Sequence, residues 1–162
     1  MLELVPPDVA RHAAWLDCHE EWGPGLHEDG FGLQPGVDVT RADSFAEWVR
    51  RMGELPGVRL WWVVEGDAVL GGLALRTADD EETARLGHVG YGIRPSARRR
   101  GVGTWALGQL LPLARAEGLS RLLLVCEDDN VGSVRTIEAQ GGVLEGVVDD
   151  GDEVARRYWI EL

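Results

Sequence analysis

A run of arginine and glycine residues near the middle of the chain has the composition of an anion-binding loop. It spans residues 98–104, Arg-Arg-Arg-Gly-Val-Gly-Thr, between an expected strand and an expected helix. The free N–H groups and the dipole at a helix N-terminus attract negative charge, and glycine lets a ligand approach the backbone. Since the chain carries a formal net charge of -12, three adjacent arginines stand out. We therefore predict a pyrophosphate site here, with a solvated turn as the alternative.

Other kinds of catalytic chemistry are excluded by residue usage. The sequence has 16 Lys plus Arg residues, and every one is Arg. A Walker-type phosphate loop and Schiff-base chemistry both require Lys. Cys18 and Cys126 form no C-x-x-C pair, so we expect neither a disulfide scaffold nor a thiolate zinc site, and no metal.

The elements that position this loop follow from the hydrophobic periodicity. We expect a mixed α/β fold in a single domain over residues 1–162, with a mostly antiparallel sheet flanked by helices. Strand 84–94 and strand 121–126, joined by a helix, should form a central parallel pair. The expected strands span residues 2–5, 59–65, 68–76, 84–94, 121–126, 143–148 and 154–160. The expected helices span residues 7–22, 44–55, 101–117 and 130–140, and residues 23–39 and 77–83 are expected to be loops.

Strand 84–94 is unusually rich in glycine, with Gly87, Gly90 and Gly92. Glycine weakens a strand and often marks a bulge or the close approach of another backbone or a ligand. We expect one of these at this strand.

Composition limits the partners and the compartment. An acidic protein binds nucleic acid poorly and attracts cations, including protonated amines. No apolar run is long enough to cross a membrane, and residues 1–7 lack the features of a signal peptide. We expect a cytoplasmic protein with no nucleic-acid or membrane partner, which the C-terminal strands could assemble into a homodimer.

Three motifs at characteristic separations resemble those of the GNAT N-acetyltransferase superfamily. Residues 98–103 match its Arg/Gln-x-x-Gly-x-Gly/Ala motif, and Ile93-Arg94-Pro95 matches the hydrophobic-x-Pro spacing before it. Asn130 to Ser133 match the Asn-x-x-Ser/Ala that follows the next strand. Together with a similar order of elements, the likeness covers nearly the whole chain. Segments 87–96, 137–145 and 157–160 also resemble a group of bacterial acetyltransferases whose acceptor is unassigned.

The resemblance implies an acetyl-CoA-dependent N-acetyltransferase, with acetyl-CoA as co-substrate and a small-molecule or peptide amine as acceptor. Backbone amides of residues 99–104 would hold the pyrophosphate, and the pantetheine would lie between splayed strands 88–94 and 121–126. A strand N–H would polarise the thioester carbonyl, and the amine would attack it directly. The residues assigned to coenzyme binding are Ile93, Arg94, Arg98, Arg99, Arg100, Gly101, Val102, Gly103, Thr104, Asn130 and Ser133.

The acid–base residues are less clearly marked. Relatives that use a His or Glu on the strand before the loop direct attention to His88, and Tyr91 is a second catalytic candidate; a hydrogen-bonded structural histidine and a packing tyrosine are the alternatives. Many relatives have a Tyr acid four residues after the motif Ser, but Ile137 stands there.

Four acidic residues in or after the first helix could bind a cationic amine, although for any single one a solvated acidic face is the favoured interpretation. Three histidines have no metal-ligand spacing and are interpreted as surface residues. The acidic residues are Glu20, Glu21, Glu28 and Asp29, and the histidines are His12, His19 and His27.

Two rival functions remain open on the sequence. The first is a non-catalytic acyl-CoA-binding or regulatory domain on the same fold, which Ile137 and the lack of an obvious base keep open. The second is a dinucleotide-binding oxidoreductase; its G-x-G-x-x-G fingerprint would end at Ala106 rather than at Gly, and this short chain lacks a second half for it.

Overall fold

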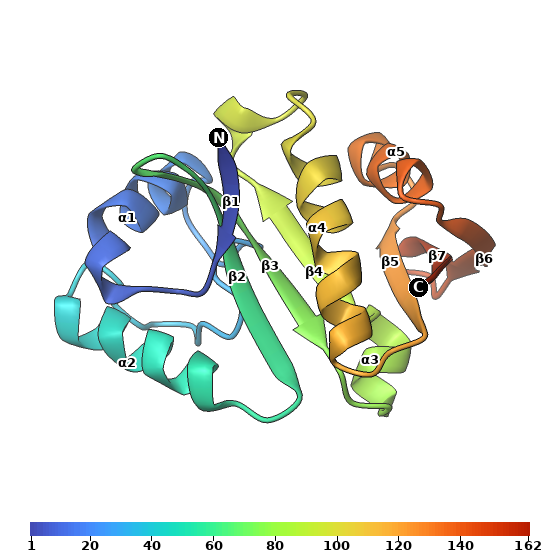
Figure 1. Cartoon of the computed structure of the whole chain (residues 1–162), viewed down its shortest axis with the longest axis horizontal. Coiled ribbons are helices and arrows are strands. Elements are labelled where there is room, and N and C mark those ends of the chain that lie inside the picture. The colour runs from blue at the N-terminus through green and yellow to red at the C-terminus, as the bar shows by residue number, and fades with distance from the viewer. The chain divides into compact units, whose positions relative to one another are not determined.

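The structure is a computed structural model that describes all 162 residues. The chain divides into two compact units, one made of residues 1–74 and 91–102 and the other of residues 75–90 and 103–162. The fold is mixed α/β, as predicted (Figure 1).

The first unit contains most of a four-stranded sheet in the order β1-β2-β3-β4. The strands are β1 (Leu2–Val5), β2 (Val58–Glu65), β3 (Ala68–Arg76) and β4 (Val89–Ile93). β1 runs antiparallel to β2, with Leu2 opposite Glu65 and Val5 opposite Trp62. β2 and β3 form a hairpin that turns at Gly66, whose φ of 59° suits glycine.

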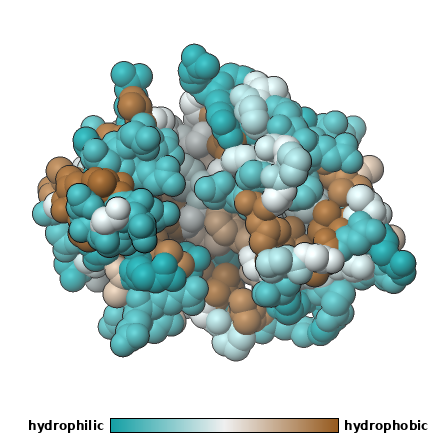
Figure 2. Space-filling view, turned by 180° about the vertical axis from the view of Figure 1, so that it is seen from behind, coloured by the Kyte–Doolittle hydropathy of each residue, from teal (hydrophilic) through white to brown (hydrophobic).

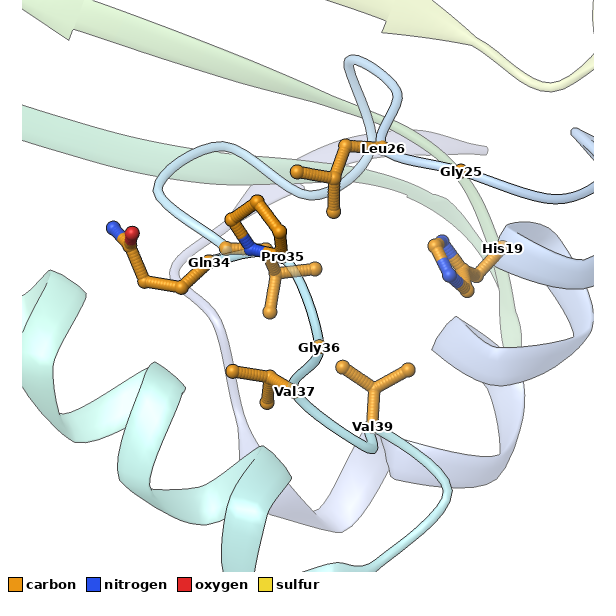
Figure 3. Close-up of a pocket in the computed structure, with 9 residues that line it drawn as sticks. His19, Gly25, Leu26, Gln34, Pro35, Gly36, Val37 and Val39 are labelled. Carbon is orange, nitrogen blue, oxygen red and sulfur yellow. The ribbon is translucent and has the colours of Figure 1, made fainter.

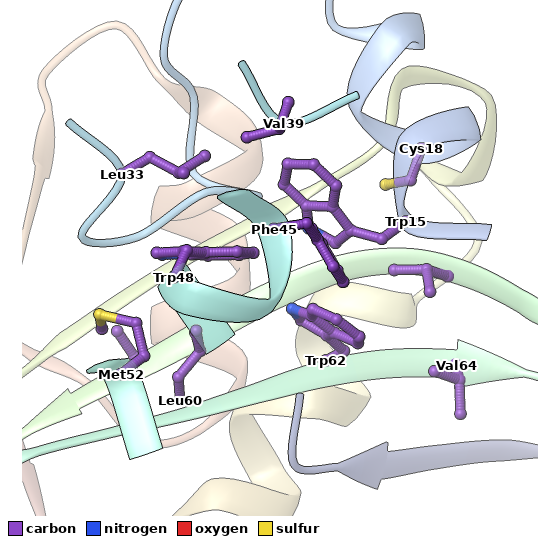
Figure 4. Close-up of a cluster of buried hydrophobic side chains, with 12 residues drawn as sticks. Trp15, Cys18, Leu33, Val39, Phe45, Trp48, Met52, Leu60, Trp62 and Val64 are labelled. Atoms are coloured by element: carbon purple, nitrogen blue, oxygen red, sulfur yellow. The ribbon is translucent and has the colours of Figure 1, made fainter. Parts of the chain in front are cut away.

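Helices α1 (His12–Glu21) and α2 (Ala42–Glu54) cover one face of this sheet. Phe45 and Trp48 of α2 pack on Trp62 of β2, and Trp15 of α1 packs on both of them. Alternate β2 residues Leu60 and Val64 join the same cluster (Figure 4). Side chains two apart on a strand share a face, so β2 has a fully packed inner side. This cluster holds α1 and α2 in place.

The second unit contains a three-stranded antiparallel sheet in the order β5-β7-β6. The strands are β5 (Arg121–Glu127), β6 (Val143–Asp149) and β7 (Val154–Glu161). The register shifts by one residue between Leu144 and Gly146, which is a β-bulge. Helices α4 (Val102–Ala116) and α5 (Val131–Ala139) complete the unit, together with a short helix α3 (Glu81–Leu86).

Three sequence expectations were wrong in detail. Residues 81–86 form α3, where we expected a loop and then the start of a strand, so β4 is shorter than predicted. Six residues are too few to show helical periodicity, but Asp80 caps the helix by accepting a hydrogen bond from the Thr83 N–H at 2.8 Å. The first helix begins late, after a 3₁₀ turn at Val9–Arg11.

The predicted parallel pairing of strands 84–94 and 121–126 stays a prediction. The bridge that joins Gly87 to Leu124 within the second unit is antiparallel. At Gly87 a side chain would meet the Leu123 carbonyl oxygen at 2.8 Å, so here glycine does mark the close approach of another backbone.

β6 is an edge strand with apolar residues exposed along it. Val143, Leu144, Val147 and Val148 are all exposed, although β6 pairs only with β7. In Figure 2, seen from behind, hydrophobic residues gather at the left edge, where β6 lies. None of the helices is long and apolar enough to span a bilayer.

Candidate functional site

The loop between β4 and α4 has an unusual backbone conformation, with two residues at positive φ. A 3₁₀ turn at Pro95–Ala97 follows β4, and α4 then begins at Val102. Arg99 is the one non-glycine residue with positive φ, at 59°, and Gly101 follows with φ 76°. A non-glycine residue in this region costs free energy and is typical of functional loops. The positive φ of Arg99 could not be inferred from its residue type, since arginine seldom adopts it.

The first turn of α4 presents a positive helix end without a carboxylate of its own. It contains no acidic residue, and the first N–H groups of a helix have no partner inside it. Val102 is buried and anchors the turn, whereas Gly103 and Thr104 are half-buried. The Thr104 carbonyl accepts a hydrogen bond from Gln140 Nε2 at 2.9 Å, which ties this turn to the end of α5. The arrangement suits an anionic ligand.

The four predicted arginines play different parts. Arg99 is exposed and pairs with no carboxylate, so its guanidinium is available to an anion. Arg98 lies over the Trp22 ring at 4.7 Å, and its Nε donates to the Ile93 carbonyl. Arg100 pairs with Glu65 at 3.0 Å on the surface.

Arg94 is committed to the protein rather than to the loop. Its guanidinium is 12% exposed and bonds Glu21 Oε2 at 2.5 Å, Asp17 Oδ2 at 2.9 Å and the Val69 carbonyl at 3.2 Å. In these contacts the guanidinium of Arg94 donates its N–H groups to acceptors on α1 and β3. The assignment of the Arg94 side chain to coenzyme binding is therefore not supported, and Ile93 beside it is a buried core residue.

Glu21 is the carboxylate that joins α1 to the start of this loop. It accepts hydrogen bonds from the Ser96 N–H at 2.5 Å, the Ser96 hydroxyl at 2.9 Å and Arg94. Partial burial acts to raise the pKa of Glu21, but the hydrogen bonds from Ser96 and the charge of Arg94 outweigh it and lower the pKa below its ordinary 4.5. Glu21 therefore has a structural role in addition to its place on an acidic helix.

β4 is crowded on the side that faces the segment after α1. A side chain at Gly92 would lie 2.5 Å from Glu28 Cβ and 2.9 Å from the Trp22 ring. The predicted close approach at this glycine is confirmed, and it brings Glu28, Trp22 and Arg98 to one place on the first unit. Tyr91 precedes Gly92 and is half-buried, and nothing in its surroundings tests a catalytic role.

His88 has the hydrogen bonds of a structural histidine. Its Nδ1 accepts the Leu123 N–H at 2.8 Å, and its backbone N–H donates to the Leu123 carbonyl at 2.7 Å. A neutral imidazole with an occupied Nδ1 acceptor carries its proton on Nε2, so neither nitrogen has a free lone pair. Burial lowers the pKa of His88, which favours this neutral form. The catalytic role stays a hypothesis, and this geometry favours the structural alternative.

Asn130 and Ser133 lie together at the start of α5. Asn130 is the N-cap, and its Oδ1 accepts the Ser133 N–H at 3.0 Å. Cys126 at the end of β5 is buried, and burial raises the pKa of its thiol, so a thiolate nucleophile is disfavoured. Burial likewise raises the pKa of Cys18 to about 12. Ile137 is buried and apolar.

The sequence profile of the acetyltransferase (GNAT) family matches residues 13–141. The chain belongs to this family. A dinucleotide-binding oxidoreductase is thereby set aside, and no curated protein matches the sequence.

Solved structures of the family share the fold with this GNAT member. The ribosomal-protein-S5-alanine acetyltransferase from Vibrio fischeri superposes with a TM-score of 0.78 at 14% identity, covering 99% of this chain and 92% of that one. Mycobacterium smegmatis RimJ, in complex with CoA-disulfide, gives 0.74 at 17% identity over 99% and 81%. YncA from Salmonella typhimurium, with its cofactor acetyl-CoA, gives 0.68 at 18% identity over 99% and 94%. At these identities the likeness is one of fold.

The Glu21 contacts predict a pH-dependent stability. Because the folded pKa is lowered, the contribution of Glu21 is full above its ordinary pKa of 4.5 and is lost as pH falls through the folded value. Glu21→Gln should lower the free energy of unfolding by about 1 kcal/mol at neutral pH, and less in acid. Urea unfolding at several pH values measures this. Exposed Glu20→Gln is the matched control, and an equal loss in both variants at all pH values would refute the role of Glu21.

The His88 hydrogen bond predicts how two substitutions differ. Asn can present an acceptor to the Leu123 N–H, whereas Leu cannot, so His88→Leu should cost about 1–3 kcal/mol of stability and His88→Asn less. Thermal unfolding and thiol-release rates, measured together, separate the roles. A fall of about 10² or more in turnover for a fully folded His88→Asn would instead establish His88 as the base.

Proposed function

We propose that this GNAT protein transfers an acetyl group from acetyl-CoA to a primary amine. The observation that carries the proposal is the loop of residues 98–104, with its strained Arg99, positive-φ Gly101 and a helix start without a carboxylate of its own. RimJ and YncA, which share the fold, hold CoA-disulfide and acetyl-CoA, and this supports the choice of ligand.

Most of the predicted coenzyme residues have a part in this proposal, but the side chains of Ile93 and Arg94 do not. Backbone N–H groups of residues 99–104 bind the pyrophosphate, and the side chain of Arg99 adds positive charge. Asn130 and Ser133 bind the pantetheine or the thiol end. Arg98 and Val102 help to hold the loop in place. Arg98 packs on Trp22, and the buried Val102 anchors the start of α4.

The reaction is a direct transfer without a covalent enzyme intermediate. The neutral amine attacks the thioester carbonyl carbon, a C–N bond forms, and the C–S bond breaks. The amine nitrogen releases one proton to solvent, and coenzyme A leaves as a thiolate that takes up a proton. A backbone N–H of β4 stabilises the oxyanion. Two buried thiols with raised pKa values offer no competing nucleophile. Because Ile137 is buried and apolar, the proton for the thiolate comes from solvent or from another group.

A second candidate function is a non-catalytic acyl-CoA-binding domain. Ile137 in place of the tyrosine acid and the occupied Nδ1 of His88 favour it. Such a protein would bind acetyl-CoA and release no thiol with any amine. The expectation of a cytoplasmic location belongs equally to both candidates.

Calorimetry with acetyl-CoA, coenzyme A and NAD tests the binding site. We expect acetyl-CoA and coenzyme A to bind and NAD not to bind. Gly103→Val should lower the affinity for acetyl-CoA by at least about tenfold, because a branched side chain blocks the approach of the pyrophosphate to the start of α4. Gly53→Val, also within a helix but with open space around it, should leave binding unchanged. Equal affinity of the two variants would refute the proposed loop.

Thiol release with a panel of amines then separates the two candidate functions. Release above the rate of hydrolysis identifies an acetyltransferase. Tight binding of acetyl-CoA without release from any amine would favour the non-catalytic domain.

We also propose that the protein forms a homodimer through β6. The exposed apolar edge of this strand supports the proposal, because such edges readily pair with another chain. Val147→Lys should shift the protein toward monomer in sedimentation equilibrium, whereas Val9→Lys, at an exposed site outside β6, should not. A wild-type protein that is monomeric at all concentrations would contradict the proposal.

A further inference from the structure

The first unit contains a cavity apart from the loop described above. It has a volume of about 300 Å³ and lies between α1 and the segment that leads to α2. In Figure 3 the side chains of Leu26, Val37 and Val39 converge with His19 around one space. The rest of the lining is glycine, proline and Leu33, apart from Gln34. The cavity is therefore mostly apolar and has one ionisable side chain, His19.

His19 is held firmly at the cavity wall. Its side chain is 17% exposed, its ring stacks on Trp15 at 4.6 Å, and its Nδ1 lies 2.6 Å from Asp29 Oδ2. We interpreted His19 as a surface residue from the sequence, and that interpretation was wrong. Since Nδ1–H donates to the carboxylate, the lone pair of neutral His19 remains on Nε2.

Asp29 makes this pair unusual. It is 1% exposed, and its Oδ1 has no hydrogen-bond partner. A buried carboxylate is costly unless it is compensated, and a fold seldom keeps one without a purpose. Its backbone is also fixed, because Trp15 Nε1 donates to the Asp29 carbonyl at 3.1 Å. Imidazole and carboxylate together form a rigid hydrogen-bonded pair beside an apolar cavity.

We propose that this cavity binds the acceptor, and that the acceptor is a primary amine carried on a short alkyl or arylalkyl group. The ammonium donates a hydrogen bond to His19 Nε2, with the Asp29 charge behind it, and the apolar group fills the space between Leu26, Val37 and Val39. The inference rests on the proposed acetyl transfer and names the substrate class for it.

The lining makes the choice of ligand specific. About 300 Å³ is at the small end of ligand pockets, which suits a group of six to eight carbon atoms. A ligand carboxylate would be repelled by the Asp29 carboxylate that lies behind His19. A diamine such as putrescine would place its second ammonium among apolar side chains, where Gln34 is the only polar side chain besides His19.

Binding is tested without acetyl-CoA, so that the result does not depend on catalysis. Hexylamine is titrated into the whole protein and followed through the ¹⁵N resonances of the His19 imidazole, with hexanoate and putrescine as comparisons. We expect hexylamine to shift the Nε2 resonance and to bind at least about tenfold more tightly than either comparison. No shift with hexylamine, or equal binding of hexanoate, would overturn the proposal.

Two matched variants locate the binding. Val37 is 39% exposed at the cavity, so Val37→Trp can fill the cavity without disturbing the core. The substitution should lower the affinity for hexylamine by at least about tenfold. Val9 lies in the same unit, is 52% exposed and is outside the cavity, so Val9→Trp should leave binding unchanged. Circular dichroism confirms that both variants are folded, and unchanged binding in folded Val37→Trp would contradict the proposal.

Thiol-release assays separate this inference from the proposed function. If acetyl-CoA binds and hexylamine is acetylated, Val37→Trp should raise KM for hexylamine more than it lowers kcat. If another amine is acetylated and hexylamine does not compete with it, the cavity is not the acceptor site, although the protein is an acetyltransferase. If acetyl-CoA does not bind at all, the proposed function fails, whatever hexylamine does at His19.

Discussion

The candidate coenzyme loop depends on one partly buried interaction, the bond of the Glu21 carboxylate with Arg94 and Ser96. Arg99 adopts a positive φ that is unfavourable for a residue with a side chain. Such a conformation persists only where the surrounding structure over-determines it. Glu21 restrains the start of this loop from α1, because it bonds both Arg94, which follows β4, and the 3₁₀ turn that leads into the loop. The negative charge on α1 thus holds a loop that itself is suited to bind negative charge.

The aromatic core of the first unit fixes the polar residues beside the cavity. Trp15 contacts Phe45 and Trp48 on one side and stacks on His19 on the other. The same indole donates its N–H to the Asp29 backbone. A single buried residue therefore fixes both members of the His19–Asp29 pair, whose charge would otherwise be unfavourable in so apolar a setting. The packing of Trp15 thus positions the polar pair, and the cavity beside it is formed without a ligand.

Close approach of backbones shapes the segment beside this pair. A side chain at Gly71 would collide with the Gly92 carbonyl, and one at Gly92 would collide with Trp22 and Glu28. The glycines let the segment after α1 lie directly against β3 and β4. The consequence is that Glu28 and Arg98, of opposite charge, are held near the same part of β4 by packing with Trp22.

Much of the local structure was decided by the sequence alone, because its signals act over a few residues. The Gly66 turn between β2 and β3, the Asn130 cap of α5 and the glycine loop before α4 each depend on neighbours within about four positions. The motifs around residues 98–104 and 130–133 were sufficient to indicate the GNAT family.

The tertiary structure alone decided how charged and polar side chains are used. Arg94 and Glu21 are 73 residues apart, and His88 and Leu123 are 35 apart, so no periodicity could pair them. Sequence reasoning consequently assigned Arg94 to the coenzyme and treated His19 as a surface residue. A polar side chain takes its role from the groups that replace water around it, and those groups are chosen only when distant segments pack together.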